Sequence, residues 1–119
     1  MERKLQPSEA NVMNIVWDRG QCSARDIAAI LAERVGWSKT TTYTVIKKCL
    51  DKGILRRTEP GFLCEAVLSR REVQTAETNE LIDRYFGGST DALVSSLLGS
   101  GRLTREEIER LRRLIGETK

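Results

Sequence analysis

The chain has 119 residues, of which 39% are hydrophobic and 31% charged, with a formal net charge of +3 at pH 7. This length and balance predict one folded domain, or one small domain with an appendage, and exclude a disordered chain. No apolar run approaches the roughly 20 residues that span a bilayer, and the first residues lack the apolar segment of a signal peptide. We therefore expect a cytoplasmic protein.

The residue types present leave little room for catalysis. The absence of histidine removes imidazole acid–base chemistry, histidine-dependent triads and histidine-ligated zinc. Three cysteines, odd in number and widely spaced, favour reduced thiols over a disulfide framework: Cys22, Cys49 and Cys64. The acidic residues that could in principle hold a metal are better explained as helix-end or solvated residues: Asp18, Asp26 and Asp51. We expect no enzyme activity, no cofactor and no metal.

Positive charge is concentrated in one part of the chain. Residues 1–69 contain 11 Lys and Arg against 8 Asp and Glu, whereas residues 70–119 contain 9 of each kind. Within residues 37–57, Asp51 is the only acid beside six basic residues: Lys39, Lys47, Lys48, Lys52, Arg56 and Arg57. Such clustering indicates a polyanionic partner more strongly than a small net charge does.

Two helices are predicted at residues 8–19 and 23–35. Ser8 is the expected N-cap of the first, with Glu9 in its first turn. The second begins with Ser23, which has an acid three residues later, as in a capping box. A glycine follows each helix as a stop signal, and Trp17 is expected to be a packing anchor of the core.

A third helix is predicted at residues 38–52, with Ser38 as its cap. Its apolar stripe must be buried and consists of Val45, Ile46, Cys49 and Leu50. The opposite face has hydroxyls, one aromatic ring and two ammonium groups but no carboxylate: Thr40, Tyr43, Thr44, Lys47 and Lys48. Donors and acceptors backed by cations suit a groove lined with phosphates.

The link between the second and third helices predicts how they cross. Only Gly36 and Trp37 separate the two helices, so they must turn sharply against one another. This is the helix-turn-helix arrangement, in which early residues of the second helix meet base edges. The threonine run at 40–42 starts there, beside Ser38 and Lys39, and we expect Thr40 and Thr41 to contact DNA.

A β-hairpin is predicted after Gly53, with strands at 54–58 and 62–67 around the turn Glu59-Pro60-Gly61. Three helices followed by a basic hairpin form a winged helix. Arg56 and Arg57 are the candidate phosphate contacts of the wing. The carboxylate of Glu59 at the tip is unfavourable near phosphate, so we expect this contact to be weak.

Residues 1–69 are predicted to form a DNA-binding domain, and residues 70–119, C-terminal to it, are predicted to form a helical dimerisation region. Capping boxes at Ser69 and Thr104 and a cap at Ser89 open three amphipathic helices. A tail this small does not build a good core alone, so it packs either on the winged helix or on a second copy. Dimerisation is favoured, through the apolar residues Leu81, Ile82, Tyr85, Phe86, Leu93, Val94, Leu97, Leu98, Ile108, Leu111, Leu114 and Ile115.

One set of residues extends along almost the whole chain from about residue 5. It comprises Ser8-Glu9-Ala10, Val12-Met13, Trp17, Trp37-Ser38 with Thr41 and Thr44, Lys52-Gly53, Tyr85-Phe86-Gly87-Gly88, Leu93-Val94, and Leu103-Thr104 before Glu106-Glu107-Ile108-Glu109-Arg110-Leu111. This set resembles the penicillinase-repressor family (BlaI/MecI/CopY type). The resemblance implies a dimeric winged-helix repressor on a palindromic operator, with the third helix in the major groove and the C-terminal helices forming the dimer.

The resemblance also assigns individual positions. Thr41 and Thr44 match family threonines that face DNA, and Lys48 matches a position that is usually basic. Thr40 and Tyr43 stand where well-known members have Lys or Arg, so we expect this chain to differ from them in operator specificity.

The inducing signals of the family do not transfer to this chain. Antibiotic-responsive members are cleaved at an Asn-Phe pair, and the aligned pair here is Ser96-Leu97. Copper-responsive members have a C-terminal cysteine site, and no cysteine follows Cys64 here. A sensing role for the three cysteines stays open, although small buried cysteines are common in cores.

The sequence thus predicts a mainly α protein with a β-hairpin wing, which acts as a sequence-specific DNA-binding repressor. Its partners are expected to be double-stranded DNA and a second copy of itself. The alternative is a protein-interaction module that docks an acidic protein and binds no nucleic acid.

Overall fold

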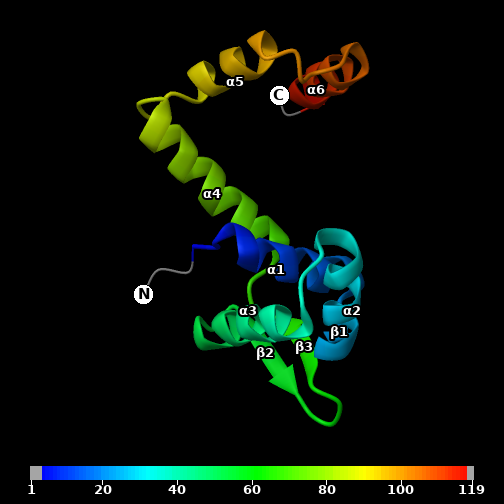
Figure 1. The fold of residues 1–119 in the computed structure, drawn as a ribbon. Coiled ribbons are helices and arrows are strands. Elements are labelled where there is room, and N and C mark those ends of the chain that lie inside the picture. Colours follow the sequence, from blue (N-terminus) through cyan, green and yellow to red (C-terminus); the bar gives the residue numbers. More distant parts are fainter. Residues whose placement is uncertain (1–3, 118–119) are drawn as a thin grey trace. The chain divides into compact units, whose positions relative to one another are not determined.

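The computed structural model describes residues 4–117 and is mainly helical, with one small antiparallel sheet (Figure 1). The chain forms two compact units, and the boundary between Glu77 and Thr78 lies within α4 (Arg70–Tyr85). The predicted functional division into residues 1–69 and 70–119 stays a prediction, and its outermost residues, 1–3 and 118–119, lie outside the described part. No helix built from the described residues is long and apolar enough to cross a bilayer.

The first unit contains three helices, α1 (Pro7–Arg19), α2 (Ala24–Val35) and α3 (Lys39–Asp51). The predicted caps of the latter two are confirmed. The Ser23 hydroxyl accepts the backbone N–H of Asp26 at 3.1 Å, and the Ser38 hydroxyl accepts that of Thr41 at 3.1 Å. Gly36 ends α2 in the left-handed conformation, at φ +72°, which is why the turn into α3 needs a residue without a Cβ.

The start of α1 differs from the prediction. The helix begins at Pro7 with Gln6 as its N-cap, so the expectation that Ser8 is the cap was wrong. Proline fixes a helical φ and has no N–H to satisfy, which makes it the first residue of the helix. Glu9 serves the new cap, because its carboxylate accepts the backbone N–H of Gln6 at 2.8 Å.

The sheet has the strand order β1-β3-β2, with β1 at Gln21–Ser23, β2 at Leu55–Thr58 and β3 at Leu63–Ala66. The predicted hairpin of β2 and β3 is confirmed, with Thr58 opposite Leu63. The strand β1 was not predicted, because three residues are too short to show an alternating pattern. It pairs Cys22 with Cys64 and so joins the α1–α2 connection to the wing.

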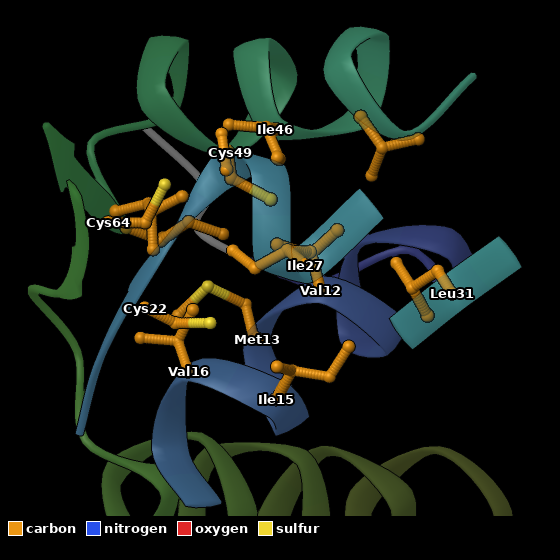
Figure 2. Packing of buried hydrophobic residues seen from close by; sticks show 14 residues of the cluster. Val12, Met13, Ile15, Val16, Cys22, Ile27, Leu31, Ile46, Cys49 and Cys64 are labelled. Carbon is orange, nitrogen blue, oxygen red and sulfur yellow. The ribbon is translucent and has the colours of Figure 1, made fainter. Parts of the chain in front are cut away.

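The core of the first unit lies between the three helices and the sheet. Figure 2 shows Ile46 and Cys49 pointing from α3 toward Val12 of α1 and Ile27 of α2. Ile46 and Cys49 are fully buried and Val45 is nearly so, which confirms the predicted buried stripe, while Leu50 is half-buried. Burial of these side chains fixes which face of α3 turns outward.

A buried ion pair joins the start of α1 to the end of α3. Lys52 Nζ donates to Glu9 Oε1 at 2.6 Å and to the backbone oxygen of Lys4 at 2.9 Å. The Glu9 side chain is only 2% exposed. A carboxylate buried in this way needs a cationic partner, so Lys52 faces inward and does not add to the basic surface.

Trp17 anchors the segment that follows the wing, as expected of a packing residue. Its ring nitrogen Nε1 donates to the backbone oxygen of Leu68 at 2.9 Å. The guanidinium of Arg70 lies 5.5 Å from the Trp17 ring and pairs with Asp18 at 2.6 Å. The first turn of α4 is therefore held against α1.

The capping boxes predicted at both ends of the tail are confirmed. The Ser69 hydroxyl accepts the Glu72 N–H at 3.0 Å, and the Thr104 hydroxyl accepts the Glu107 N–H at 3.1 Å. The hydrogen bonds that Glu107 accepts from Thr104 lower the pKa of its carboxyl group. The second unit also contains α5 (Thr90–Gly99), capped by Ser89 as predicted, and α6 (Arg105–Glu117).

We predict that Lys52→Met destabilises the protein by about 3 kcal/mol, because the buried Glu9 carboxylate loses its charged partner. The measurement is the free energy of unfolding in urea. Lys47→Met is the matched control, since Lys47 forms an exposed ion pair with Asp51 at 3.3 Å and should change stability by less than about 0.5 kcal/mol. Equal effects of the two substitutions would contradict the role given to Lys52.

Candidate nucleic-acid interface

The outward face of α3 forms a shallow open groove. The groove has a volume of about 420 Å³ and is lined by Lys39, Thr40, Tyr43, Thr44 and Lys47. All of these except Tyr43, which is half-buried, are exposed. The helical spacing predicted four of these five residues on one face, and Lys39 joins them in the groove. Lys48, the fifth residue of the predicted face, is exposed but does not line the groove.

The first turn of α3 uses two of the predicted hydroxyls for its own cap. Ser38 Oγ donates to Thr41 Oγ1 at 3.0 Å while it accepts the Thr41 N–H. Both residues are exposed, so the capping hydroxyls still lie at the surface. Their orientation is fixed before any ligand binds.

Thr42 faces the core, although it belongs to the same run of threonines. It is fully buried, and within the described residues its hydroxyl has no hydrogen-bond partner. The run 40–42 therefore divides between two faces, since successive helical residues are rotated by about 100°. The expectation that the threonine run 40–42 lies where base edges are met is therefore wrong for Thr42.

The cations of the basic segment have different surroundings. Lys39 and Lys48 are exposed, and neither forms an ion pair within residues 4–117. Lys47 pairs with Asp51 in a solvated contact that contributes little energy. Lys52 is committed to Glu9. The charge that α3 offers to a ligand therefore comes chiefly from Lys39 and Lys48, with Lys47 beside them.

The wing arginines both have acidic neighbours. Arg56 Nη2 lies 2.6 Å from Glu65 Oε1 across the hairpin, and Arg57 hydrogen-bonds to Glu59. The bond from Arg57, with help from the Phe62 N–H, lowers the pKa of the exposed Glu59 carboxyl. These pairs agree with the expected weakness of a phosphate contact by the wing.

Two aromatic rings connect the wing to α3. The Tyr43 and Phe62 rings meet edge to face, with centroids 5.8 Å apart and planes at 82°. The Arg57 guanidinium carbon lies 3.6 Å from the centre of the Phe62 ring, and Lys39 Nζ lies 5.7 Å from that of Tyr43. The sequence pattern predicted Phe62 only as the first residue of a strand and did not indicate its ring contacts with Tyr43 and Arg57.

The second unit leaves much of its apolar surface uncovered. Eight large hydrophobic residues in it are between 41% and 69% exposed: Leu81, Tyr85, Val94, Leu97, Leu98, Leu111, Leu114 and Ile115. Four others of the predicted dimerisation set are more covered, with Ile82 buried and Phe86, Leu93 and Ile108 half-buried. A monomeric soluble protein rarely exposes so many apolar side chains together.

All three cysteines are free thiols within the core of the first unit. Burial, together with the negative charge of nearby Glu9, raises the pKa of Cys49 to about 12. Burial likewise raises the pKa of Cys64 to about 11 and also raises that of Cys22. Groups of cysteine and acidic side chains that could hold a metal are absent from the described residues.

Comparison with known proteins identifies the family. The family model named penicillinase repressor matches residues 5–117. The chain belongs to the penicillinase repressor family. It is similar to the penicillinase repressor of Bacillus licheniformis, with 21% identity covering 98% of this chain and 92% of that protein. It is also similar to the methicillin resistance regulatory protein MecI of Staphylococcus aureus strain N315, with 24% identity covering 96% and 94%.

A solved structure supports the fold. The DNA-binding domain of the repressor BlaI, determined in solution, matches with a TM-score of 0.55 and 20% identity over 60% of this chain and 93% of that one. The winged-helix prediction is thereby confirmed. As a member of the penicillinase repressor family, the chain is a DNA-binding transcriptional repressor and not an enzyme.

We predict that the three thiols of this repressor react slowly with a disulfide reagent at pH 8. Their raised pKa values keep them protonated, and burial blocks access. Unfolding in urea should make all three react at once. The pKa values of Cys49 and Cys64 in the folded protein lie above the ordinary value of 9.0, so their neutral thiols favour the folded state. This contribution to stability is complete below pH 9 and is lost as pH rises toward about 11 to 12. Fast labelling of one thiol in the native protein would reopen a sensing role.

Proposed function

We propose that this repressor binds a palindromic DNA operator as a homodimer, with α3 of each subunit in the major groove. The supporting observation is the outward face of α3, where hydroxyls, a phenol and lysines line one groove. The major groove presents both donors and acceptors on base edges, which such groups can meet. Repression would follow from occupation of a promoter, and the protein would act in the cytoplasm.

Base edges and phosphates would be met by different residues. Thr40, Thr41, Tyr43 and Thr44 have the short hydroxyls and the ring that read base edges, whereas Lys39, Lys47 and Lys48 have flexible ammonium groups suited to phosphate oxygens. Ser38 stands at the start of the helix, where phosphate contacts are common. Arg56 and Arg57 would contribute less, because each already has an acidic neighbour.

The homodimer is proposed to form through the second unit. Its exposed leucines, valine, isoleucine and tyrosine would be covered by the same surface of a second copy. Two-fold symmetry would then place two copies of α3 on two half-sites of equal sequence. A protein-interaction role without DNA binding is set aside, because the family consists of DNA-binding regulators.

We predict that Thr44→Ala and Lys48→Ala differ in kind on an operator selected from random DNA. Thr44→Ala should relax discrimination at one base pair of each half-site, by about 1 kcal/mol. Lys48→Ala should weaken binding to every sequence and flatten the slope of log affinity against log salt by about 1 per subunit. For the wild-type dimer with about four phosphate contacts per subunit, that slope should be on the order of −7.

The control for this pair is binding of both variants to an unrelated duplex. Thr44→Ala should match the wild type there, since non-specific binding depends on phosphate contacts alone. Identical behaviour of the two variants would refute the assignment of roles, and salt-independent binding of the wild type would refute α3 as a major-groove element.

We predict that Leu114→Glu converts the dimer to a monomer without unfolding the subunit, because Leu114 is 56% exposed in the isolated chain. Sedimentation equilibrium measures the change. Val67→Glu is the matched control, since Val67 is 44% exposed but lies in the first unit. A Leu114→Glu protein that remains dimeric at micromolar concentration would exclude this face as the interface.

A further inference from the structure

The aromatic contact between the wing and α3 involves a strained backbone. Phe62 has a φ of +47°, in the left-handed region that residues with a Cβ rarely adopt. Gly61 before it has a φ of +92°, so the hairpin turn already contains a residue suited to such angles. A bulky residue that stays in a strained conformation indicates a requirement for its side chain.

Phe62 is held from three directions. Its ring meets Tyr43 edge to face, and the Arg57 guanidinium stacks on it at 3.6 Å. Its backbone N–H donates to Glu59 Oε1 at 3.2 Å, while Glu59 also accepts from Arg57. Arg57 and Glu59 therefore neutralise each other beside the ring. The Arg57 guanidinium packs on Phe62 and is not directed at a ligand.

Tyr43 is consequently fixed on two sides. Phe62 supports its ring from the wing, and Lys39 Nζ lies 5.7 Å from the ring centre on the side of the α3 groove. Both aromatic residues also pack against the core, which restricts their rotamers. A side chain held in one rotamer before binding loses little entropy on binding and tolerates displacement of its contacts poorly.

We infer that Tyr43 determines specificity at one base pair of each half-site and that Phe62 and Arg57 are its positioning residues. The wing then contributes to sequence discrimination through Arg57 and Phe62, separately from any weak phosphate contact of Arg56. The inference rests on the proposed binding of α3 in the major groove. It assigns to Phe62 and Arg57 a role that acts through Tyr43.

The test is selection of operators from a random pool of double-stranded DNA by the full-length wild type, Tyr43→Ala, Phe62→Gly and Val67→Ala. Phe62→Gly removes the ring and introduces glycine, which adopts the positive φ of this position without strain. It should relax the same base-pair position as Tyr43→Ala, lowering the preference there by roughly fivefold or more, and leave the salt slope unchanged. Val67→Ala is the control, because Val67 is an exposed side chain of the first unit outside the α3 face and the two rings, and it should keep the wild-type preference.

Two further variants separate positioning from a structural effect. Phe62→Leu keeps an apolar side chain without the aromatic edge and should relax the same position with the melting temperature little changed. The double variant Phe62→Gly with Tyr43→Ala should be no less selective than Tyr43→Ala alone, because both substitutions remove the same contribution of Tyr43 to specificity. Arg57→Gln should reduce the preference at that position without flattening the salt slope.

Several results would overturn the inference while the proposed function stands. They are full discrimination by Phe62→Gly, relaxation at a different position from Tyr43→Ala, or a salt slope flattened by about 1 per subunit in Arg57→Gln. Enrichment of no sequence at all by the wild type would instead contradict the proposed function itself.

Discussion

Burial of one face of α3 is the constraint on which the rest of the structure depends. Ile46 and Cys49 are fully enclosed between α1, α2 and the sheet, so the helix cannot rotate without exposing them (Figure 2). The Glu9–Lys52 pair fixes the end of the same helix, because an unpaired buried carboxylate would be costly. With its inner face and its end both fixed, α3 has a single outward surface, and that surface carries the groups suited to DNA.

This arrangement divides the basic residues of the segment between structure and binding. Lys52 stabilises the fold, the wing arginines neutralise acidic neighbours, and Lys47 is partly engaged with Asp51. Fewer cations than the sequence contains are available to phosphate. We propose that the affinity of this repressor depends on the remaining lysines, whereas its sequence discrimination depends on the fixed hydroxyls and the Tyr43 ring. Such groups favour discrimination between sequences over non-specific binding.

The two units differ in how much of their own apolar surface they bury. The first encloses a core that includes all three cysteines, which pack there as small apolar side chains, and their burial raises the pKa of the thiols. The second has well-capped helices, but large side chains such as Tyr85 and Ile115 stay exposed. Local signals set where α5 and α6 begin and end, but helices this short are only marginally stable alone and gain most of their stability when their apolar faces are covered.

The sequence by itself determined the helices, their caps, the hairpin and the two faces of α3, because periodicity and capping act between residues a few positions apart. It misplaced the start of α1, where Pro7 outweighed Ser8, and it missed β1. Only the tertiary structure decided that Lys52 turns inward to Glu9, that Thr42 is buried, and that Phe62 supports Tyr43. The ion pair and the ring contact join residues 43 and 19 positions apart. Such contacts depend on how the elements pack, which no local pattern records.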